Sequence, residues 1–468
     1  MSQNNFSSLP LHSLLLQNLE SLNYHSMTAI QAQSLPHVLK NKDVIVQGKT
    51  GSGKTAVFGL GLLNKLDQKQ FRIQSIVLCP TRELADQVAK EIRQLGRLIQ
   101  NIKILTLCGG TPLHTQVNSL AHGVHIIVGT PGRIEDLLQK NKLNLDEITS
   151  LVLDEADKML DMGFQPSIEK IIKYLPNKRQ TLLFSATFPD EIKSIAKHVM
   201  NQPEHIQHEL THDNETIQQS FFSINNQINR TTALRLLLLH YQPTSAVVFC
   251  NTKKATTQLA KQLTNYGFSA IALNGDLEQR DRNQILVQFA NQSISILVAT
   301  DVAARGLDID NLDAVINYEV SQDAEIHLHR IGRTGRAGKS GVACTLYSED
   351  EHHKIIQLEI FLKQSIESSP LPAQDLLDNP SYQPRMCTIR IEAGKKQKLR
   401  PGDILGTLTS NKQIAAKEIG KITVTDKCTY VAVNRNIKSS ALNTLKNGKI
   451  KGRSFRFKAI NESPKVWP

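Results

Sequence analysis

The residues best suited to chemistry form a glycine-rich segment, Gly48 to Thr55, with the sequence Gly-Lys-Thr-Gly-Ser-Gly-Lys-Thr. Two glycines that flank four residues, followed by Lys and a hydroxyl residue, can turn backbone N–H groups toward phosphate oxygens. In this pattern Lys54 can reach the β- and γ-phosphates, and the Thr55 hydroxyl suits a Mg²⁺ ligand. We therefore predict a nucleoside triphosphate site in a loop made of Gly48, Lys49, Thr50, Gly51, Ser52, Gly53, Lys54 and Thr55. The alternative is a glycine-rich turn that happens to precede a helix.

Two acidic residues follow a hydrophobic run further along the chain. Asp154 and Glu155 come directly after Leu151–Leu153. An Asp at the end of a buried strand can hold Mg²⁺ opposite a phosphate loop, and a neighbouring Glu can position or deprotonate an attacking water. A run of acids that only caps the next helix is the alternative. The upstream phosphate loop favours the chemical interpretation, with Asp154 on the metal and Glu155 on the water.

Two arginine-rich segments lie in the second half of the chain, at Ala299–Asp308 and His329–Arg336. Arg333 and Arg336 are three residues apart in a glycine-containing turn, so both can face one anion, and their planar guanidinium groups suit phosphate. An arginine that a second domain presents to a bound nucleotide can raise the hydrolysis rate by roughly 10³–10⁵. A charged loop that forms surface ion pairs, or that contacts a phosphate backbone without catalysis, is the alternative.

Short apolar runs alternate with amphipathic segments around these residues, which predicts parallel sheets with helices on both faces. A first domain is predicted over residues 1–205, with strands at Val44–Val46, Ser75–Cys79, Ile104–Cys108, His125–Val128, Leu151–Leu153 and Thr181–Phe184. A second is predicted over residues 216–365, with strands at Ala246–Cys250, Ala270–Leu273, Ser295–Ala299, Ala314–Asn317 and Gly341–Leu346. The fold class is therefore α/β, with two parallel-sheet domains in tandem.

The remaining residues are predicted to form a linker and a small third domain. Residues 366–384 contain several serines and prolines, which favours a linker, and residues 385–460 form the last domain. Its predicted strands and helices are Cys387–Ile391, Arg400–Leu408, Lys421–Val424, Thr429–Val433, Asn436–Leu445 and Ser454–Lys458. This βαββαβ order predicts a small α+β domain of a kind that commonly binds RNA.

Positive charge is concentrated in that last segment. The 468-residue chain has a net charge of +12. From Arg385 onward there are 19 Lys and Arg against 5 Asp and Glu, whereas the residues before Arg385 hold 36 against 38. Such asymmetry indicates a module that meets a polyanion. A solvated basic tail is the alternative.

Several classes of protein are disfavoured. No apolar run approaches the length that spans a bilayer, and the first residues lack the layout of a secretory signal. The six cysteines include no Cys-x-x-Cys pair, so neither zinc nor a disulfide framework is indicated. We expect reduced thiols in a cytoplasmic protein, with a monomer as the default state.

The ordered motifs of the first two domains resemble those of the DEAD-box ATP-dependent RNA helicases. They are Gln31, GKTGSGKT, PTREL, GG, TPGR, DEAD, SAT, ATDVAARGLD and HRIGRTGR, and the resemblance covers residues 6 to about 340. It implies two RecA-like domains, with ATP between them and single-stranded RNA bound across both.

The resemblance also implies roles for residues around the nucleotide. Phe6 and Gln31 match the elements that recognise adenine, and Asp308 matches a nucleotide contact from the second domain. Arg333 and Arg336 match paired arginine fingers.

Two further sets of residues are implied by the same resemblance. Ser185-Ala186-Thr187 resembles the element that couples hydrolysis to strand separation, through Asp157. Contacts to the RNA backbone are implied at Pro80, Thr81, Arg82, Gly109, Gly110, Thr130, Pro131, Gly132, Arg133, Gln279, Arg282 and Thr300. Most of these residues are small, polar or cationic, which suits binding that is independent of base sequence.

The basic module resembles the C-terminal, RRM-like domain of the bacterial DbpA branch of this family, in Ala393–Gly406, Ile419–Ile422 and Gly448–Arg453. That resemblance implies a hairpin of 23S ribosomal RNA as the target and a role in 50S subunit assembly. The expected sheet lacks paired aromatic residues, and Tyr430 is the one candidate on the expected strand. We therefore expect recognition through loop and edge residues, namely Lys395, Lys396, Lys398, Arg400, Lys451 and Arg453. A general electrostatic tether is the alternative.

Together these features predict an RNA-dependent ATPase that uses ATP and Mg²⁺ to separate short RNA duplexes locally, on pre-50S ribosomal particles. Two other functions stay open. One is an RNA clamp that never unwinds, which a strand-displacement assay with ATP or a non-hydrolysable analogue would distinguish. The other is a DNA motor, which an ATPase assay with DNA in place of RNA would distinguish.

Overall fold

Buried apolar runs of about four residues recur along the chain, and most of them form strands. The computed structural model describes residues 4–48, 52–207, 217–224, 228–304, 312–335, 340–410 and 413–460. The described residues up to Gln207 form one compact unit and those from Ile217 onward form another.

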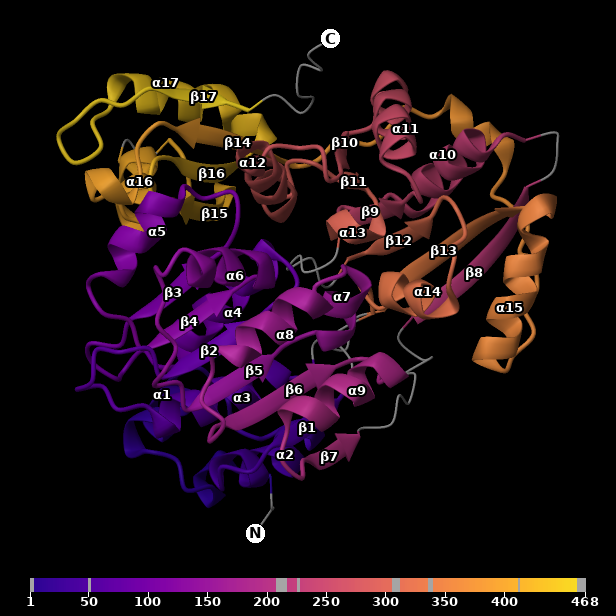
Figure 1. Ribbon diagram of the computed structural model, residues 1–468. Helices are drawn as coiled ribbons and strands as arrows, with labels where there is room; N and C mark the ends of the chain where they lie inside the picture. Colours follow the sequence, from indigo (N-terminus) through magenta and orange to yellow (C-terminus); the bar gives the residue numbers. More distant parts are fainter. Residues whose placement is uncertain are drawn as a thin grey trace. The chain divides into compact units, whose positions relative to one another are not determined.

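The first unit is a parallel seven-stranded sheet with strand order β3-β4-β2-β5-β6-β1-β7 (Figure 1). Its strands are β1 Val44–Gln47, β2 Ser75–Leu78, β3 Ile104–Leu107, β4 Ile126–Gly129, β5 Ser150–Leu153, β6 Gln180–Ser185 and β7 Glu204–Gln207. Its helices are α1 Ser13–Ser21, α2 Ala29–Leu39, α3 Lys54–Lys65, α4 Arg82–Leu95, α5 Leu113–Leu120, α6 Pro131–Gln139, α7 Ala156–Asp161, α8 Gln165–Lys173 and α9 Asp190–Val199. The predicted parallel sheet is confirmed.

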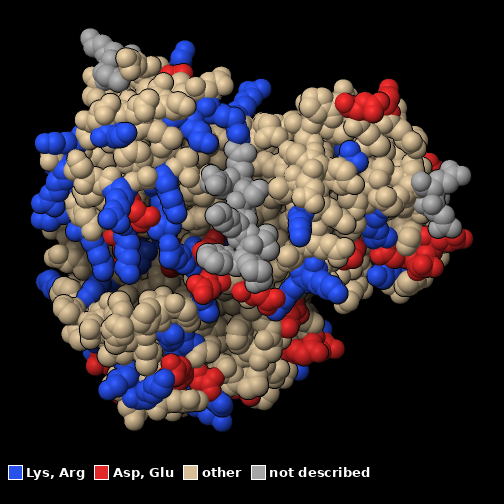
Figure 2. Space-filling model, turned by 90° about the horizontal axis from the view of Figure 1, so that it is seen from above, with Lys and Arg blue, Asp and Glu red and all other residues tan. Residues whose placement is uncertain are grey.

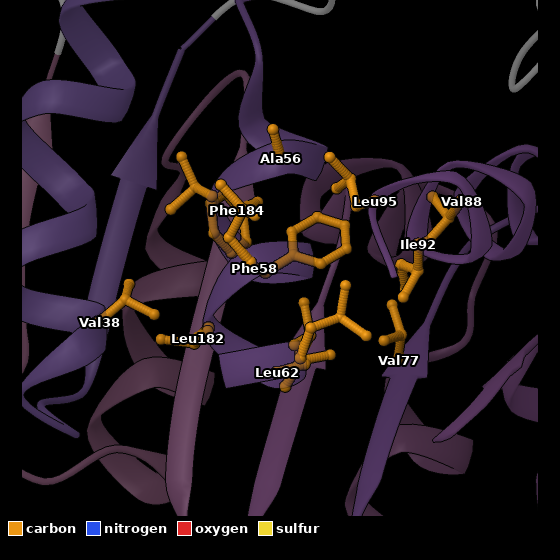
Figure 3. Close-up of a cluster of buried hydrophobic side chains, with 14 of the residues drawn as sticks. Val38, Ala56, Phe58, Leu62, Val77, Val88, Ile92, Leu95, Leu182 and Phe184 are labelled. Atoms are coloured by element: carbon orange, nitrogen blue, oxygen red, sulfur yellow. The ribbon is translucent and has the colours of Figure 1, made fainter. Parts of the chain in front are cut away.

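Hydrophobic cores lie on both faces of this sheet because successive strand residues point to opposite sides. Helices α1 to α4 cover one face, where Phe58 of α3 meets Phe184 of β6 with ring centroids 5.1 Å apart. Figure 3 shows these rings among the aliphatic side chains of the same cluster, including Leu62. Helices α6 to α9 cover the other face. Both faces are buried, which explains why the strands read as uninterrupted apolar runs.

The second unit contains a parallel six-stranded sheet with strand order β10-β11-β9-β12-β13-β8. Its strands are β8 Ile217–Ile224, β9 Ala246–Phe249, β10 Ala270–Leu273, β11 Ile296–Ala299, β12 Ala314–Asn317 and β13 Gly341–Ser348. Its helices are α10 Arg230–Tyr241, α11 Lys253–Asn265, α12 Gln279–Ala290, α13 Asp301–Ala304, α14 Ala324–Ile331 and α15 His352–Leu362. The prediction of a second parallel-sheet domain is confirmed.

Two edge strands were not predicted. β7 pairs in parallel with β1, and β8 pairs in parallel with β13 over eight residues. Both carry polar side chains because an edge strand is less buried, so neither stands out as an apolar run. The predicted domain limit at residue 205 consequently falls inside β7.

The segment predicted to be a linker, residues 366–384, lies against the second sheet domain. Leu371, Leu376, Leu377 and Tyr382 pack against the core that contains α10 and α11. Ser381 Oγ donates a hydrogen bond of 2.6 Å to the carbonyl of Tyr266. The segment therefore packs as a strap over the domain that precedes it.

The C-terminal module has the predicted βαββαβ order. Its elements are β14 Met386–Ile391, α16 Pro401–Thr409, β15 Ile419–Val424, β16 Thr429–Asn434, α17 Lys438–Asn447 and β17 Phe457–Ala459. The four strands form an antiparallel sheet of order β15-β16-β14-β17. The last strand begins three residues later than predicted.

Within the second unit, one face of this small sheet is covered by α12 and the turn that follows it. Thr388 of β14 accepts a hydrogen bond of 3.1 Å from Asn291 Nδ2, and its hydroxyl lies 2.7 Å from Ser293 Oγ. Arg390 donates to Gln284 Oε1 at 3.2 Å. Thr388 and Arg390 are both buried. The module is thus joined to the second sheet domain by buried polar contacts.

The six cysteines are all buried, and none of them forms a disulfide. None of the helices in the described part of the chain has the length and apolar character needed to cross a membrane.

Candidate active site

The phosphate loop joins β1 to α3 as predicted. Lys49, Thr50 and Gly51 lie outside the described residues. Gly53 has φ +88°, and a Cβ there would lie 2.4 Å from Gln31 Nε2, so a glycine is required at that position. Helix α3 begins at Lys54, which places its first N–H groups at the loop, where an anion is stabilised.

Lys54 is buried, with 7% of its surface exposed. Its ammonium donates a hydrogen bond to the carbonyl of Gly48. Burial lowers the pKa of Lys54, and the carboxylates of Asp154 and Glu155 oppose that effect. A phosphate in the loop would add the negative charge that this buried ammonium lacks.

Of the two residues expected to recognise adenine, Gln31 contacts the loop directly. Phe6 is buried, with its ring centroid 6.2 Å from that of Tyr24. Gln31 accepts a hydrogen bond from Thr28 N at 2.9 Å and donates one to the carbonyl of Gly53 at 3.2 Å. The Gln31 side chain therefore connects α2 to the phosphate loop.

The two acidic residues lie at the end of β5. Asp154 is 4% and Glu155 6% exposed. Burial, with a smaller contribution from Glu155, raises the pKa of Asp154 to about 7, and Lys54 and Lys158 oppose the increase. The positive charges of the two lysines are therefore too weak to offset the burial of Asp154. A divalent metal ion bound to this carboxylate would supply the missing positive charge.

The donor set suits Mg²⁺ bound together with a nucleotide. The described residues contain no group of three or more His, Cys, Asp or Glu able to hold a metal ion. Mg²⁺ is usually bound through one or two carboxylates together with substrate phosphates and water. Asp154 and Thr55 fit that manner of binding.

Glu155 has an unusual backbone. Its φ of 52° and ψ of 53° are left-handed, and it precedes the first residue of α7. Its Oε1 lies 2.7 Å from Lys158 Nζ. Its Oε2 is buried and has no hydrogen-bond partner among the residues that the structure describes. Strained backbone of this kind gathers at functional sites.

The structure brings the predicted coupling residues together. One carboxylate oxygen of Asp157 accepts hydrogen bonds from Ala186 N and Thr187 N, both at 3.0 Å. Asp157 N in turn donates to Ser185 Oγ at 3.3 Å. Burial alone would raise the pKa of Asp157, but the Lys158 charge and the Thr187 N–H outweigh it and hold that pKa below its usual value. Helix α7 is therefore tied to the end of β6.

The predicted RNA contacts of the first unit gather beyond the carboxyl ends of β2, β3 and β4, where open parallel sheets bind their ligands. Pro80 and Thr81 precede α4, and Thr81 caps that helix by accepting from Leu84 N at 3.2 Å. The guanidinium of Arg82 lies against Gly109 and Gly110, and Gly110 has φ +78°. A side chain at Gly110 would overlap that guanidinium.

The Thr130-Pro131-Gly132-Arg133 segment opens α6 at the same end of the sheet. Arg133 donates to the carbonyl of Thr111 at 3.0 Å and to Gln116 Oε1 at 2.8 Å. It thus fixes the turn that contains Gly109 and Gly110. The three predicted segments of the first unit thus follow neighbouring strands, and β2 pairs with β5, which precedes Asp154 and Glu155.

The second unit holds the remaining core residues. Arg282 of α12 donates to the carbonyl of Ala303 at 2.8 Å, and Thr300 Oγ1 accepts from Ala303 N at 3.4 Å. Gln279 opens the same helix, α12. Arg333 is buried, with 8% of its surface exposed. Asp308 and Arg336 lie outside the described residues.

Arg330 organises the arginine-rich segment His329–Arg336, although no role was predicted for it from the sequence. It is 2% exposed and donates to both carboxylate oxygens of Asp301, at 2.7 and 2.8 Å. It also donates to Asn317, Asn251 and the carbonyl of Glu319. The only indication in the sequence was that Asp301 lies in the segment Ala299–Asp308 and Arg330 in the segment His329–Arg336.

Two loops of the C-terminal module that were predicted to bind RNA lie side by side. Lys395 and Lys396 form a turn of 3-10 helix, Lys398 follows it with φ 60°, and Arg400 precedes α16. Lys451 of the second loop donates to the carbonyl of Lys398 at 2.7 Å. Figure 2 shows Lys and Arg side chains gathering over this module.

The sheet face of the module is not open for base stacking. Tyr430 is 5% exposed, and its cross-strand partner Arg390 is 8% exposed. Both lie on the face that α12 covers, since Arg390 bonds Gln284 there. This face of the sheet is therefore closed to base stacking, and RNA contact through loops and edges stays a prediction.

Comparisons with known proteins extend this description. Family models match as a DEAD/DEAH box helicase over residues 28–195, a Helicase conserved C-terminal domain over 229–338 and a DbpA RNA binding domain over 388–459. The chain is 49% identical over 445 residues to the ATP-dependent RNA helicase DbpA of Escherichia coli (strain K12), covering 95% of this chain and 97% of that protein. It is 35% identical over 471 residues to DbpA of Bacillus subtilis (strain 168), covering 96% and 98%.

A solved structure is also similar to this chain. S. cerevisiae Dbp5 bound to RNA and ADP BeF3 matches with a TM-score of 0.72 and 30% identity, covering 80% of this chain and 97% of that one.

Proposed function

We propose a reaction cycle and a target for this chain, which belongs to the DbpA branch of the DEAD-box ATP-dependent RNA helicases. RNA stimulates its hydrolysis of ATP, and hydrolysis drives the local separation of short RNA duplexes. The observation that carries this proposal is the buried charge cluster of the first unit. There Lys54, Asp154 and Glu155 are all less than a tenth exposed, and the pKa of Asp154 is raised to about 7.

The residues around the phosphate loop divide the chemistry between them. The Lys54 ammonium and the first N–H groups of α3 bind the phosphates. Thr55 and Asp154 would hold Mg²⁺, and the bound ion would neutralise negative charge on the phosphates. Glu155 accepts the proton that the attacking water loses as its oxygen attacks the γ-phosphorus. Phe6 and Gln31 select adenine.

The second unit completes the site by its arginines. Arg333 and Arg336 stabilise charge on the γ-phosphate in the transition state, and Asp308 contacts the nucleotide. Arg330 and Asp301 fix the segment from which Arg333 extends, since Arg330 is bonded on all sides. Hydrolysis therefore requires both units to engage one ATP.

RNA binding is coupled to this chemistry through the first unit. Arg82 and Arg133 lie beyond the carboxyl ends of the strands and hold the Gly109–Gly110 turn. They bind the RNA backbone there, together with Gln279, Arg282 and Thr300 of the second unit. The Asp157 hydrogen bonds to Ala186 and Thr187 link hydrolysis to strand separation.

The target is a hairpin of 23S ribosomal RNA in particles that mature into the 50S subunit, and the protein acts as a monomer. The support is the match of residues 388–459 to the DbpA RNA binding domain and the basic loops of that module. Lys395, Lys396 and Lys398 contact the folded RNA, and the core acts on neighbouring helices.

The test measures ATPase stimulation by a 23S ribosomal RNA fragment and by bulk RNA. The full chain with Lys395→Ala and Lys396→Ala is preferable to a truncation, because removing the module would expose its buried contacts to α12. We expect selective stimulation by the 23S fragment to fall about tenfold or more in this variant, while stimulation by saturating bulk RNA persists.

The matched control removes two exposed lysines of the first unit, Lys142→Ala and Lys178→Ala. It should keep the selectivity. Equal stimulation of the unaltered protein by 23S and bulk RNA would contradict the proposed target.

A further inference from the structure

Lys158 is buried together with the carboxylate to which the proposed mechanism gives the proton of the attacking water. Its Nζ lies 2.7 Å from Glu155 Oε1, and the two side chains are 4% and 8% exposed. Lys158 lies three residues after Glu155 in the first turn of α7, and residues at that spacing face each other. The contact is therefore built within one short segment.

This contact uses one oxygen of Glu155 and leaves the other open. Oε2 is buried and has no hydrogen-bond partner among the residues that the structure describes. A carboxylate anchored through one oxygen can accept a proton on the other without losing its orientation. A base that is oriented by a third group is the arrangement found in many sites that activate a nucleophile.

The Lys158 ammonium donates its hydrogen bond to Glu155, although its charge also acts on Asp154 and Asp157. Its backbone N donates to Asp157 Oδ1 at 2.9 Å. Glu155 precedes α7 with a left-handed backbone, φ 52°, and its side chain contacts Lys158 of that helix. Strained backbone persists where the surrounding contacts determine it.

We propose that Lys158 is a positioning residue, which orients Glu155 so that Oε2 receives the proton of the attacking water. The proposal rests on the proposed role of Glu155 as the base. Lys158 acts through Glu155 and contacts neither the phosphate nor the water. Its loss should slow the chemical step without weakening the binding of ATP or RNA.

The experiment compares Lys158→Met, Lys158→Arg, Glu155→Gln and the double variant in the full chain. We expect Lys158→Met to lower the RNA-stimulated kcat about 10- to 100-fold, since a misplaced catalytic group costs that much. The KM for ATP should change by less than about twofold. Lys158→Arg should recover most of the rate because it keeps a charged donor. The double variant should be no slower than Glu155→Gln, since both changes remove one function.

The matched control is Lys170→Met. Lys170 Nζ lies at the same distance from a glutamate, 2.7 Å from Glu135 Oε1, but its side chain is 56% exposed. This variant should keep the full kcat. If Lys158→Met does not fold, Lys158→Gln replaces it, with thermal unfolding measured for every variant.

The outcomes separate two claims, namely that Glu155 is the base and that Lys158 positions it. Normal turnover by Glu155→Gln would refute the base itself. Loss of turnover in Glu155→Gln with a full rate in Lys158→Met would refute the positioning role alone. A loss in Lys158→Met that Arg does not restore would also refute it, because a charged donor would then not be what the site needs. A loss that comes with an equal rise in KM would refute it as well, because Lys158 would then act on ATP binding and not on the chemical step.

Discussion

Both units bury charged side chains, and the two clusters differ in how completely their groups are paired. In the second unit, the Arg330 guanidinium makes five hydrogen bonds, which is the number of N–H donors that it has. Its partners include both oxygens of Asp301. Nothing in that cluster calls for a ligand.

The cluster of the first unit is incompletely paired. The pKa of Asp154 is raised to about 7, mainly by burial. Among the described residues, Glu155 Oε2 has no hydrogen-bond partner, and the Lys54 ammonium donates to the backbone carbonyl of Gly48. Buried charge that lacks partners is costly, so it persists where function requires it. The comparison therefore separates a cluster that holds the fold together from one that the proposed mechanism completes with ATP and Mg²⁺.

The largest effect on stability should come from the fully paired cluster. Arg330→Met leaves the partly buried Asp301 carboxylate without its buried partner, and breaking a fully buried pair costs about 3–5 kcal/mol, which sets the upper limit here. Urea unfolding should show this loss as a lower midpoint. Arg230→Met, which removes a more exposed partner of Glu351, should cost less. An Arg330 variant as stable as the unaltered protein would undo the distinction between the clusters.

For Lys54 we expect the opposite pattern, a large loss of activity with little loss of stability. Lys54→Met should lower ATP hydrolysis about 10²- to 10³-fold, the usual effect of removing one group that stabilises transition-state charge. Its free energy of unfolding without nucleotide should stay within about 1 kcal/mol or rise, because burial already disfavours the charged ammonium. Parallel ATPase and unfolding measurements test this. A large loss of stability would mean that Lys54 belongs to the scaffold.

The raised pKa of Asp154 predicts a pH dependence of stability. Because the folded-state pKa of about 7 lies above the unfolded value, the folded protein binds the extra proton between about pH 4 and 7. The stability from this proton is lost as the pH rises toward 7. Asp154→Asn should remove that decline and be the more stable form at pH 7, by a few kcal/mol at most.

The ionisation of Asp154 should also affect the binding of ATP with Mg²⁺. Mg²⁺ requires the ionised carboxylate, so binding of ATP with Mg²⁺ should weaken as the pH falls below about 7, by at most about tenfold per pH unit. Calorimetry at several pH values measures both effects. Stability and affinity that do not vary with pH in this range would place the pKa of Asp154 near its ordinary value.

The smallest effect is expected at an exposed pair. Lys451 lies 3.0 Å from Asp403 Oδ2, with 41% of its side chain exposed. Exposed pairs contribute little, so Lys451→Met should shift the melting temperature by about 2 °C or less. Differential scanning calorimetry measures it. A much larger shift would show that the bond from Lys451 to the carbonyl of Lys398 holds the two basic loops in place.

Local patterns in the sequence were enough to predict much of the fold and much of the candidate site. The Gly48–Thr55 loop is defined by residues that are neighbours in the chain, with a buried strand before it and a helix after it. Asp154 and Glu155 are placed by β5 in the same way. Parallel strands buried on both faces gave the apolar runs that predicted both large sheets.

Contacts between distant or rotamer-dependent residues could not be predicted in this way. The bonds between Thr388 and Asn291 join segments almost a hundred residues apart, and both residues are ordinary polar side chains in the sequence. Lys158 could have faced solvent, and only the side-chain geometry shows that it meets Glu155. The polar edge strand β7 lacks the apolar run that identified the others.

The account is tested most directly by the hydrolysis of bound ATP in the Glu155→Gln protein. A single-turnover assay with saturating RNA measures the chemical step, and a fluorescent ATP analogue measures binding separately. We expect nucleotide and RNA to bind as in the unaltered protein while cleavage slows at least 100-fold, since the amide cannot take the proton of the water. Cleavage at the unaltered rate would show that the incompletely paired cluster of the first unit is not where ATP is hydrolysed.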